Sequence, residues 1–336
     1  MRYVQIVICS ILILAASGHA RCAEVPRAQA AIVKVRASIA SDARTADALG
    51  KNREGNGVVI DAEGLILTIG YLILEAETIE VVRPDGESVM AAYVGYDHAT
   101  GFGLIKAVHR RGLVPIEMGR SSMLETGDPV LLVGYGPNAI RPANIIARRE
   151  FVGYWEYLLE DALYASPPHP EFAGAVMMDA DGRLVGIGSI YTRLDFPPFG
   201  SVPCNMFVPI DLLKPILEDL VHNGRSAAPP KPWLGVNAEE TRGRVFIDRV
   251  HAQGPAELAG LQANDMVLNV NREAVTGLAD FYRKVWALGQ AGVRVPLTIL
   301  HGNHVKEVEV HSSDRHHYLR IRPTLKAPKA ILEKSI

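Results

Sequence analysis

The 336-residue sequence lacks the features that would place it in several specialised classes. Its three cysteines are too few for a disulfide scaffold. Its formal net charge of −2 gives no basic field, so we expect no nucleic-acid partner. Hydrophobic residues make up 48% and charged residues 21%, the balance of a globular protein with a substantial core. At about 100–200 residues per domain, the length indicates two domains or three small ones.

The apolar run at residues 4–16 is shorter than the roughly 20 apolar residues that a bilayer-spanning helix needs. Arg2 precedes this run, and small residues follow it at 17–20 and at 22–23. This order is typical of a secretory signal peptide. We therefore expect residues 1–23 to be a signal peptide and the mature protein to lie in a bacterial periplasm. An uncleaved, signal-anchored form is the alternative.

Short apolar runs separated by turn residues fill the next part of the chain, for example at 57–61, 65–68, 78–82, 129–133 and 184–187. This pattern is typical of an all-β barrel or sandwich. A helix is predicted at 211–221, with Asp211 as its N-cap. The proline-rich segment 223–232 indicates a linker. A second unit follows at 233–315, with helical stretches at 255–259 and 279–286, and a flexible basic tail is expected at 316–336.

Three segments of the second unit carry a resemblance: Trp233-Leu234-Gly235-Val236, residues 254–265 and residues 267–271. In this order and spacing they resemble a PDZ domain of the bacterial HtrA/Deg-type proteins, with a generic small α/β domain as the alternative. The resemblance implies an α/β PDZ fold whose backbone N–H groups at Trp233, Leu234, Gly235 and Val236 receive a peptide's terminal carboxylate. The expected partners are C-terminal peptides or unfolded polypeptides.

The β-rich unit, residues 24–222, resembles the trypsin-like protease domain that precedes the PDZ domain in HtrA-type proteins. The matching segments are residues 55–68, 97–106, 118–122, 127–130, 133–137, 170–176 and 206–209. The resemblance implies a mainly β chain with the two-barrel chymotrypsin fold, followed by the PDZ domain. It also implies a possible homotrimer, or a mixed oligomer with active relatives.

The same resemblance places Tyr71, Gly101 and Ala173 at the family's catalytic His, Asp and Ser positions. Glu171 stands where the family has the glycine that donates one N–H of the oxyanion hole. Loss of the Ser or the His alone costs such a triad about 10⁶ in turnover. We therefore expect a catalytically inactive protease homologue that binds peptides as a scaffold, chaperone or adaptor. The alternative is an active periplasmic serine endopeptidase with a non-standard nucleophile.

Other polar residues of the first unit could supply that nucleophile or its base. They are Ser166, Ser189 and Ser201, and His98, His109 and His169. None stands at a triad position, so we expect them in turns and on the surface. The five histidines His301, His304, His311, His316 and His317 match no metal-binding spacing, and Cys204 is expected in the core. We expect no metal and no cofactor.

Overall fold

Two closed six-stranded barrels form the N-terminal part of the chain in this computed structural model, which describes residues 29–136, 139–198 and 200–321. The first barrel has the strand order β1-β2-β3-β6-β5-β4. Its strands are β1 (Ile32–Ile39), β2 (Asn52–Val59), β3 (Leu65–Ile69), β4 (Ala76–Val82), β5 (Ser88–Tyr96) and β6 (Phe102–Ala107). Closure leaves neither end of the sheet with unpaired backbone groups.

The second barrel has the strand order β10-β11-β12-β9-β8-β7. Its strands are β7 (Pro129–Val133), β8 (Ile140–Gly153), β9 (Tyr157–Ser166), β10 (Val176–Met178), β11 (Leu184–Phe196) and β12 (Gly200–Pro209). Three short helical turns lie between barrel strands, α2 (Ala46–Leu49), η1 (Gly70–Leu72) and η2 (Ser121–Met123), and a fourth, η3 (Ile210–Leu212), follows β12. The sequence-based prediction of a mainly β fold for this unit is confirmed.

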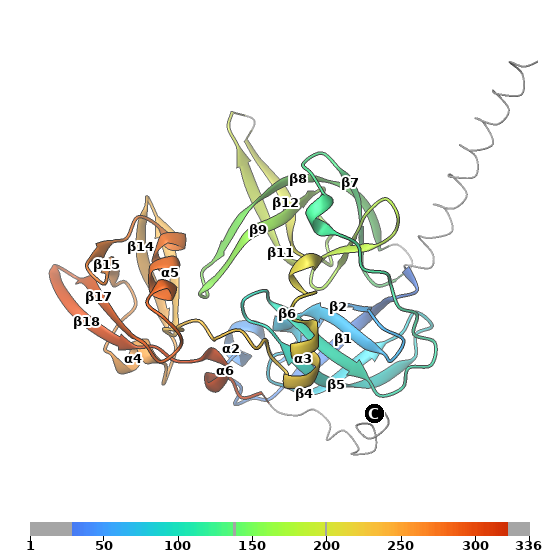
Figure 1. The fold of residues 1–336 in the computed structure, drawn as a ribbon, viewed down its shortest axis with the longest axis horizontal. Helices are drawn as coiled ribbons and strands as arrows, with labels where there is room; N and C mark the ends of the chain where they lie inside the picture. The colour runs from blue at the N-terminus through green and yellow to red at the C-terminus, as the bar shows by residue number, and fades with distance from the viewer. Residues whose placement is uncertain (1–28, 137–138, 199, 322–336) are drawn as a thin grey trace, which may run out of the picture.

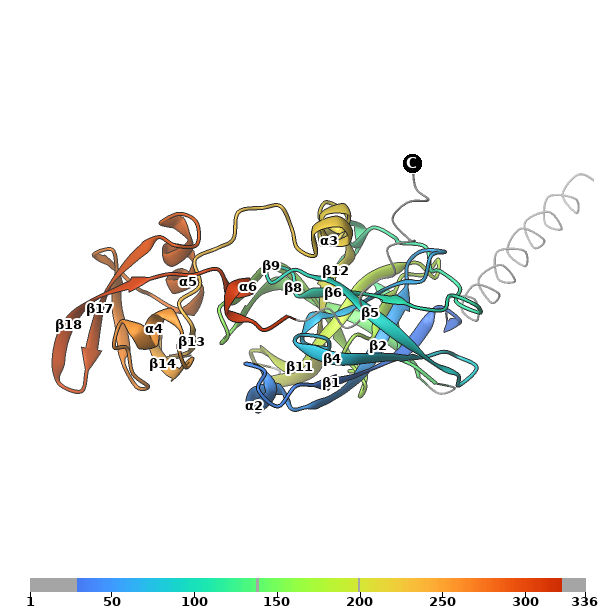
Figure 2. The same cartoon turned by 90° about the horizontal axis from the view of Figure 1, so that it is seen from below.

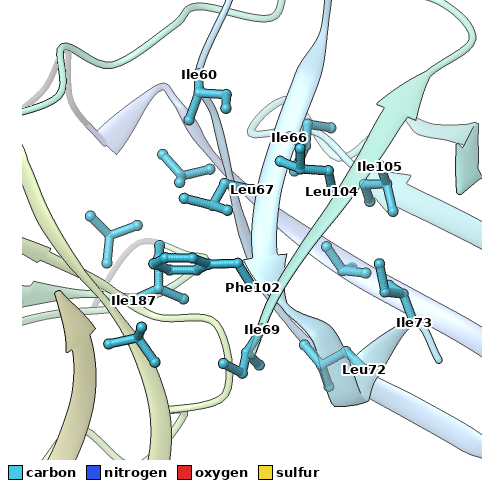
Figure 3. Close-up of a cluster of buried hydrophobic side chains, with 14 of the residues drawn as sticks. Ile60, Ile66, Leu67, Ile69, Leu72, Ile73, Phe102, Leu104, Ile105 and Ile187 are labelled. Carbon is cyan, nitrogen blue, oxygen red and sulfur yellow. The ribbon is translucent and has the colours of Figure 1, made fainter. Parts of the chain in front are cut away.

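The core of the first barrel continues into the contact between the two barrels. Ile66 and Leu67 of β3 and Phe102 of β6 are fully buried. Figure 3 shows Phe102 beside Ile187 of β11, and both belong to one buried apolar cluster. The barrels are thus packed together, which fixes the loops that meet between them.

The C-terminal unit is a six-stranded sheet in which five strands have the order β13-β14-β15-β17-β18 and the sixth, β16, pairs with β15. Its strands are β13 (Val236–Thr241), β14 (Arg244–Val250), β15 (Met266–Val270), β16 (Glu273–Ala274), β17 (Arg294–His301) and β18 (His304–His311). Its helices are α4 (Pro255–Leu258) and α5 (Leu278–Ala287), close to the predicted helical stretches. The buried side chains of α5 recur at helical spacing, at Leu278, Phe281, Tyr282 and Val285, and pack into the core of this unit.

The prediction of one helix at 211–221, capped by Asp211, is wrong. The segment instead contains η3 and, after a break, α3 (Leu217–Asn223). Pro215 falls in the break, because proline lacks the N–H that a helix interior needs. The Asp211 carboxylate instead accepts hydrogen bonds from Lys214 Nζ at 2.6 Å and from Ser122 N at 2.8 Å.

A short helix, α6 (Arg315–Tyr318), lies between the barrels and the C-terminal unit (Figure 2). After it, Leu319 is buried in a cluster with Leu74 and Tyr96 of the first barrel. The start of the expected flexible tail is therefore packed against the protein, and residues 322–336 lie outside the described residues. The predicted signal peptide, residues 1–23, also lies outside them. Within the described residues, no helix has the length and apolar character to cross a membrane.

Candidate functional site

The loop after β3 and the turn before β6 are held side by side where the two barrels meet. Tyr71 lies in η1, directly after Gly70, whose N–H donates to the Gly101 carbonyl at 2.7 Å. Gly101 has φ +82°, a left-handed conformation that glycine adopts without strain. Its own N–H donates to the Asp97 carbonyl at 2.8 Å and closes the turn.

The segment that contains Ala173 reaches the same place from the second barrel. The Ala173 carbonyl accepts from Asn56 N at 2.8 Å, and Gly174 N donates to the Gly188 carbonyl at 2.8 Å. The Tyr71 hydroxyl donates to the carbonyl of Ser189, the residue after Gly188, at 2.7 Å. These contacts bring the Tyr71, Gly101 and Ala173 segments together at the barrel interface.

The side chains at these three positions have little acid–base chemistry of their own. Burial raises the pKa of Tyr71 above its ordinary value, so its hydroxyl stays protonated and acts as a hydrogen-bond donor. Ala173 has only a methyl group and Gly101 has no side chain. Glu171 is exposed, but its backbone N–H donates to His169 Nδ1 at 3.1 Å and is not free to bind an oxyanion. A cavity of ≈ 260 Å³, lined in part by Tyr135, Arg141, His169 and Glu171, opens beside it.

The other hydroxyls and imidazoles singled out in the sequence lie apart from one another. Ser166 Oγ donates to the Pro203 carbonyl at 2.9 Å, and Ser201 Oγ accepts from Arg193 Nε at 3.1 Å. His169 Nε2 lies 2.8 Å from the Ala139 carbonyl. Within the described residues, none of the hydroxyls of Ser166, Ser189 and Ser201 hydrogen-bonds to an imidazole.

A second site lies at the start of the C-terminal unit, in the carboxylate loop (residues 233–236). Three consecutive backbone N–H groups of this loop point to one carboxylate, that of Glu156. Leu234 N donates to Oε2 at 2.8 Å, and Gly235 N and Val236 N donate to Oε1 at 2.8 and 3.0 Å. Gly235 has φ +81°, which turns the chain so that successive N–H groups converge.

Three of the four residues expected from the sequence therefore donate to a carboxylate, and Trp233 does not. The Trp233 N–H donates instead to the Ser313 carbonyl at 3.0 Å. Its buried ring packs against the rings of His251 and Tyr318. Sequence reasoning missed Glu156, because nothing in its neighbourhood signals a contact with residues about 80 positions away.

Glu156 is 3% exposed and lies in the turn between β8 and β9. Burial raises the pKa of its carboxyl to about 7, while the three backbone donors and Arg315 act in the opposite direction. A cavity of ≈ 340 Å³ adjoins it, lined by residues of the barrels, the linker and the C-terminal unit, among them His98, Pro230 and Trp286.

Other polar side chains of the C-terminal unit have structural contacts. His301 Nδ1 lies 2.6 Å from the buried Asp265 carboxylate. Among the residues that the structure describes, no three histidine, cysteine, aspartate or glutamate side chains gather as a metal site. Cys204 is fully buried, and burial raises the pKa of its thiol to about 11.

Comparison with known protein families agrees with this division of the chain. Residues 55–187 match the trypsin-like peptidase domain, and residues 232–311 match the PDZ domain. The predicted fold class, a trypsin-like domain followed by an α/β PDZ domain, is confirmed.

Curated relatives share about a quarter of their residues with this chain. A probable periplasmic serine endoprotease, DegP-like, of Bartonella henselae is 26% identical over 250 residues, 69% of this chain and 47% of the relative. The protein of the same description from Pseudomonas fluorescens is 26% identical over 275 residues, 76% of this chain and 55% of the relative. The chain thus spans about half the length of these relatives.

Solved structures share the fold. The HtrA-type protease AlgW with a decapeptide has a TM-score of 0.52 at 22% identity, over 90% of this chain and 99% of that one. A serine endoprotease from Yersinia pestis has a TM-score of 0.52 at 24% identity, over 88% of this chain and 97% of that one.

These comparisons contradict the expectation that the protein is not an enzyme. The curated relatives are named serine endoproteases, and the structural neighbours are proteases. That expectation rested on the residues at positions 71, 101, 173 and 171, and no observation shows a loss of activity. Together, the trypsin-like peptidase domain, the PDZ domain after it and the DegP-like relatives show that this chain belongs to the HtrA-type protease family.

Proposed function

We propose that this protein is an HtrA-type protein of the bacterial periplasm that binds polypeptides by their carboxyl-terminal carboxylates through its PDZ domain. One observation carries this proposal: three consecutive N–H groups, at Leu234, Gly235 and Val236, converge on a carboxylate. Carboxylate capture by such a backbone nest, with strand addition beside it, is an established mode of peptide recognition. The names of the curated relatives and the predicted signal peptide support the periplasmic location.

The test compares labelled decapeptides, randomised at their last three positions, with a free or an amidated carboxyl terminus. Each pool is titrated into the full chain and followed by fluorescence anisotropy. We expect the free-carboxylate pool to bind about 10-fold or more tightly than the amidated pool, because an amide removes the charge that the three donors select. Equal binding of the two pools would contradict the proposal.

We further propose that the protein is a serine endopeptidase, because its curated relatives carry that name. Since position 173 is an alanine, the nucleophile is then at another position. In this proposal Tyr71, Gly101 and Ala173 occupy the family's His, Asp and Ser positions, and Glu171 the oxyanion position. The nucleophile is then the hydroxyl of another serine. The candidates named from the sequence, Ser166, Ser189 and Ser201, lie in the second barrel. Its oxygen bonds to the substrate's carbonyl carbon, the carbon–nitrogen bond breaks, and the hydroxyl proton goes to the leaving amine; water then hydrolyses the ester, which releases the acid and restores the serine hydroxyl.

Unfolded casein and a fluorophosphonate probe test the second proposal. We expect casein cleavage, block of cleavage by the probe, and one labelled serine that peptide mass spectrometry identifies. Substitution of the labelled serine by alanine should abolish cleavage. Substitution by alanine of those among Ser166, Ser189 and Ser201 that are not labelled should leave cleavage unchanged. Absence of both cleavage and label over many hours would contradict endopeptidase activity and leave the peptide-binding proposal untouched.

A further inference from the structure

The hairpin turn (residues 153–156) between β8 and β9 of the second barrel extends to the PDZ domain. In Figure 1 the β8–β9 hairpin ends beside α5 and the sheet that contains β14. The turn contacts three parts of that domain: the carboxylate loop, strand β13 and helix α5. These are the elements that would surround a peptide bound by strand addition.

The turn is held there by its backbone as well as by its carboxylate. The Tyr154 carbonyl accepts from Ala238 N of β13 at 2.8 Å, a hydrogen bond of the kind that an added strand makes. From α5, the Tyr282 hydroxyl donates to the Gly153 carbonyl at 3.1 Å and accepts from Glu156 N at 3.2 Å. The turn therefore makes hydrogen bonds to both β13 and α5.

The Glu156 side chain then fills the position of a terminal carboxylate. Both of its oxygens accept backbone hydrogen bonds from the carboxylate loop. Glu156 also has φ +57°, an uncommon conformation for a residue other than glycine.

We propose that Glu156 is an internal ligand of the PDZ domain, so that a peptide carboxylate enters the loop only in exchange for the hairpin turn. This inference rests on the proposed peptide-binding function. The apparent affinity for a peptide is then the intrinsic affinity of the open loop multiplied by the fraction of molecules in which the turn has left the loop. The competing ligand is a polypeptide end with a free carboxylate, which offers the same two oxygens.

The test uses the full chain and the variants Glu156→Gln and Glu156→Ala. The first keeps the size of the side chain, and the second removes its head group. The matched control is Glu160→Gln on the same hairpin, where Glu160 pairs with Arg283 of α5 at 2.6 Å and is largely exposed. The free-carboxylate and amidated decapeptide pools are titrated into all four proteins, and hydrogen exchange of the amides of residues 234–236 is measured without peptide.

We expect both Glu156 variants to bind the free-carboxylate pool roughly 10- to 100-fold more tightly than the unchanged protein, the effect of one or two charge-assisted hydrogen bonds. The amides of residues 234–236 should exchange faster in these variants, and the control should match the unchanged protein in both measurements. Equal, carboxylate-dependent binding by all four proteins would overturn the inference and leave the proposed function standing. Failure of every protein to prefer the free carboxylate would overturn the proposed function, and the inference with it.

Discussion

Tyr71 shows how a single side chain can join the two barrels at the place where their loops meet. Its hydroxyl crosses from η1 of the first barrel to the Ser189 carbonyl of β11 in the second. The ring packs against the apolar cluster that extends through both barrels. The tyrosine at this position therefore links the two barrels through one hydrogen bond and through the packing of its ring.

Replacing Tyr71 by Phe should lower the stability of the protein. The ring would still pack, but the partly enclosed Ser189 carbonyl would lose its donor, which costs about 1–2 kcal/mol in the free energy of unfolding. Urea denaturation followed by tryptophan fluorescence measures this change. Tyr191→Phe is the matched control because Tyr191 lies on the same strand and is 49% exposed. Equal stability of the two variants would show that the hydroxyl contributes nothing.

At the scale of single elements, the β8–β9 hairpin and α5 depend on each other across the domain boundary. Tyr282 is one of the buried residues of α5 and is 1% exposed. Its ring packs in the PDZ core, while its hydroxyl bridges two backbone groups of the hairpin turn. The apolar face of one helix thus also carries the polar contact that positions a distant turn.

Tyr282→Phe should loosen the hairpin turn and leave the PDZ core intact. Two backbone groups, at Gly153 and Glu156, would lose their shared partner, so the amides of residues 153–156 should exchange with solvent several-fold faster. Hydrogen exchange followed by mass spectrometry measures this rate. Tyr154→Phe, in the same turn but 54% exposed, should leave the rate unchanged. Protection equal to that of the unchanged protein would contradict the role of the hydroxyl.

The elements that the sequence predicts are those whose signals are local. Short apolar runs separated by turn residues indicate the barrel strands, and the helical stretch predicted at 279–286 is close to α5. The carboxylate loop was also predictable, because the segment at 233–236 resembles the start of a PDZ domain. The prediction of one helix at 211–221 is wrong because it followed the apolar spacing, whereas Pro215 interrupts the helix. Glu156 was not predictable, since its partners are set by how two domains pack.

At the scale of the whole molecule, ionisable groups are buried where α6 and the hairpin turn join the domains. Arg315 Nη1 of α6 lies 2.9 Å from His98 Nε2. Burial, and then the charge of Arg315, lowers the pKa of His98 well below its ordinary value. Burial also lowers the pKa of His251 to about 4. The docked domains therefore contain neutral imidazoles that would bind protons in water near pH 6.

Several other groups face His98 from the elements packed around it. The Tyr96 hydroxyl is 3.1 Å from Nδ1, and the Glu156 carbonyl is 3.1 Å from Nε2. His316 and Lys231 add further positive charge nearby. The Glu156 carboxyl acts in the opposite sense, because its pKa is raised to about 7 and docking makes it take up a proton between about pH 7 and 4.5. On docking, the His98 imidazole therefore releases a proton over part of the pH range in which this carboxyl takes one up.

We expect the His98 imidazole to weaken docking of the two domains as the pH falls from about 6.5 to about 5. A histidine whose pKa is lowered by docking stabilises the docked state fully above its free pKa of about 6.5, and this contribution declines below that value. Each net proton released on docking changes the balance by about 1.4 kcal/mol per pH unit. Energy transfer between fluorophores on the two domains measures docking. His98→Gln, which cannot take a proton, should keep the domains docked to a lower pH than the unchanged protein, and identical profiles would contradict the assignment.

The linker that precedes the PDZ domain contains Pro229, Pro230 and Pro232, which restrict the conformations that the linker can adopt. A binding partner tethered by a short connection acts at an effective concentration on the order of millimolar. A dissolved polypeptide at about a micromolar would need to bind roughly 1,000-fold more tightly than the hairpin turn to fill half of the loops. The tether thus sets a threshold for the concentration of free polypeptide. Carboxyl termini that are dilute or bind weakly do not displace the hairpin turn, whereas those that accumulate do.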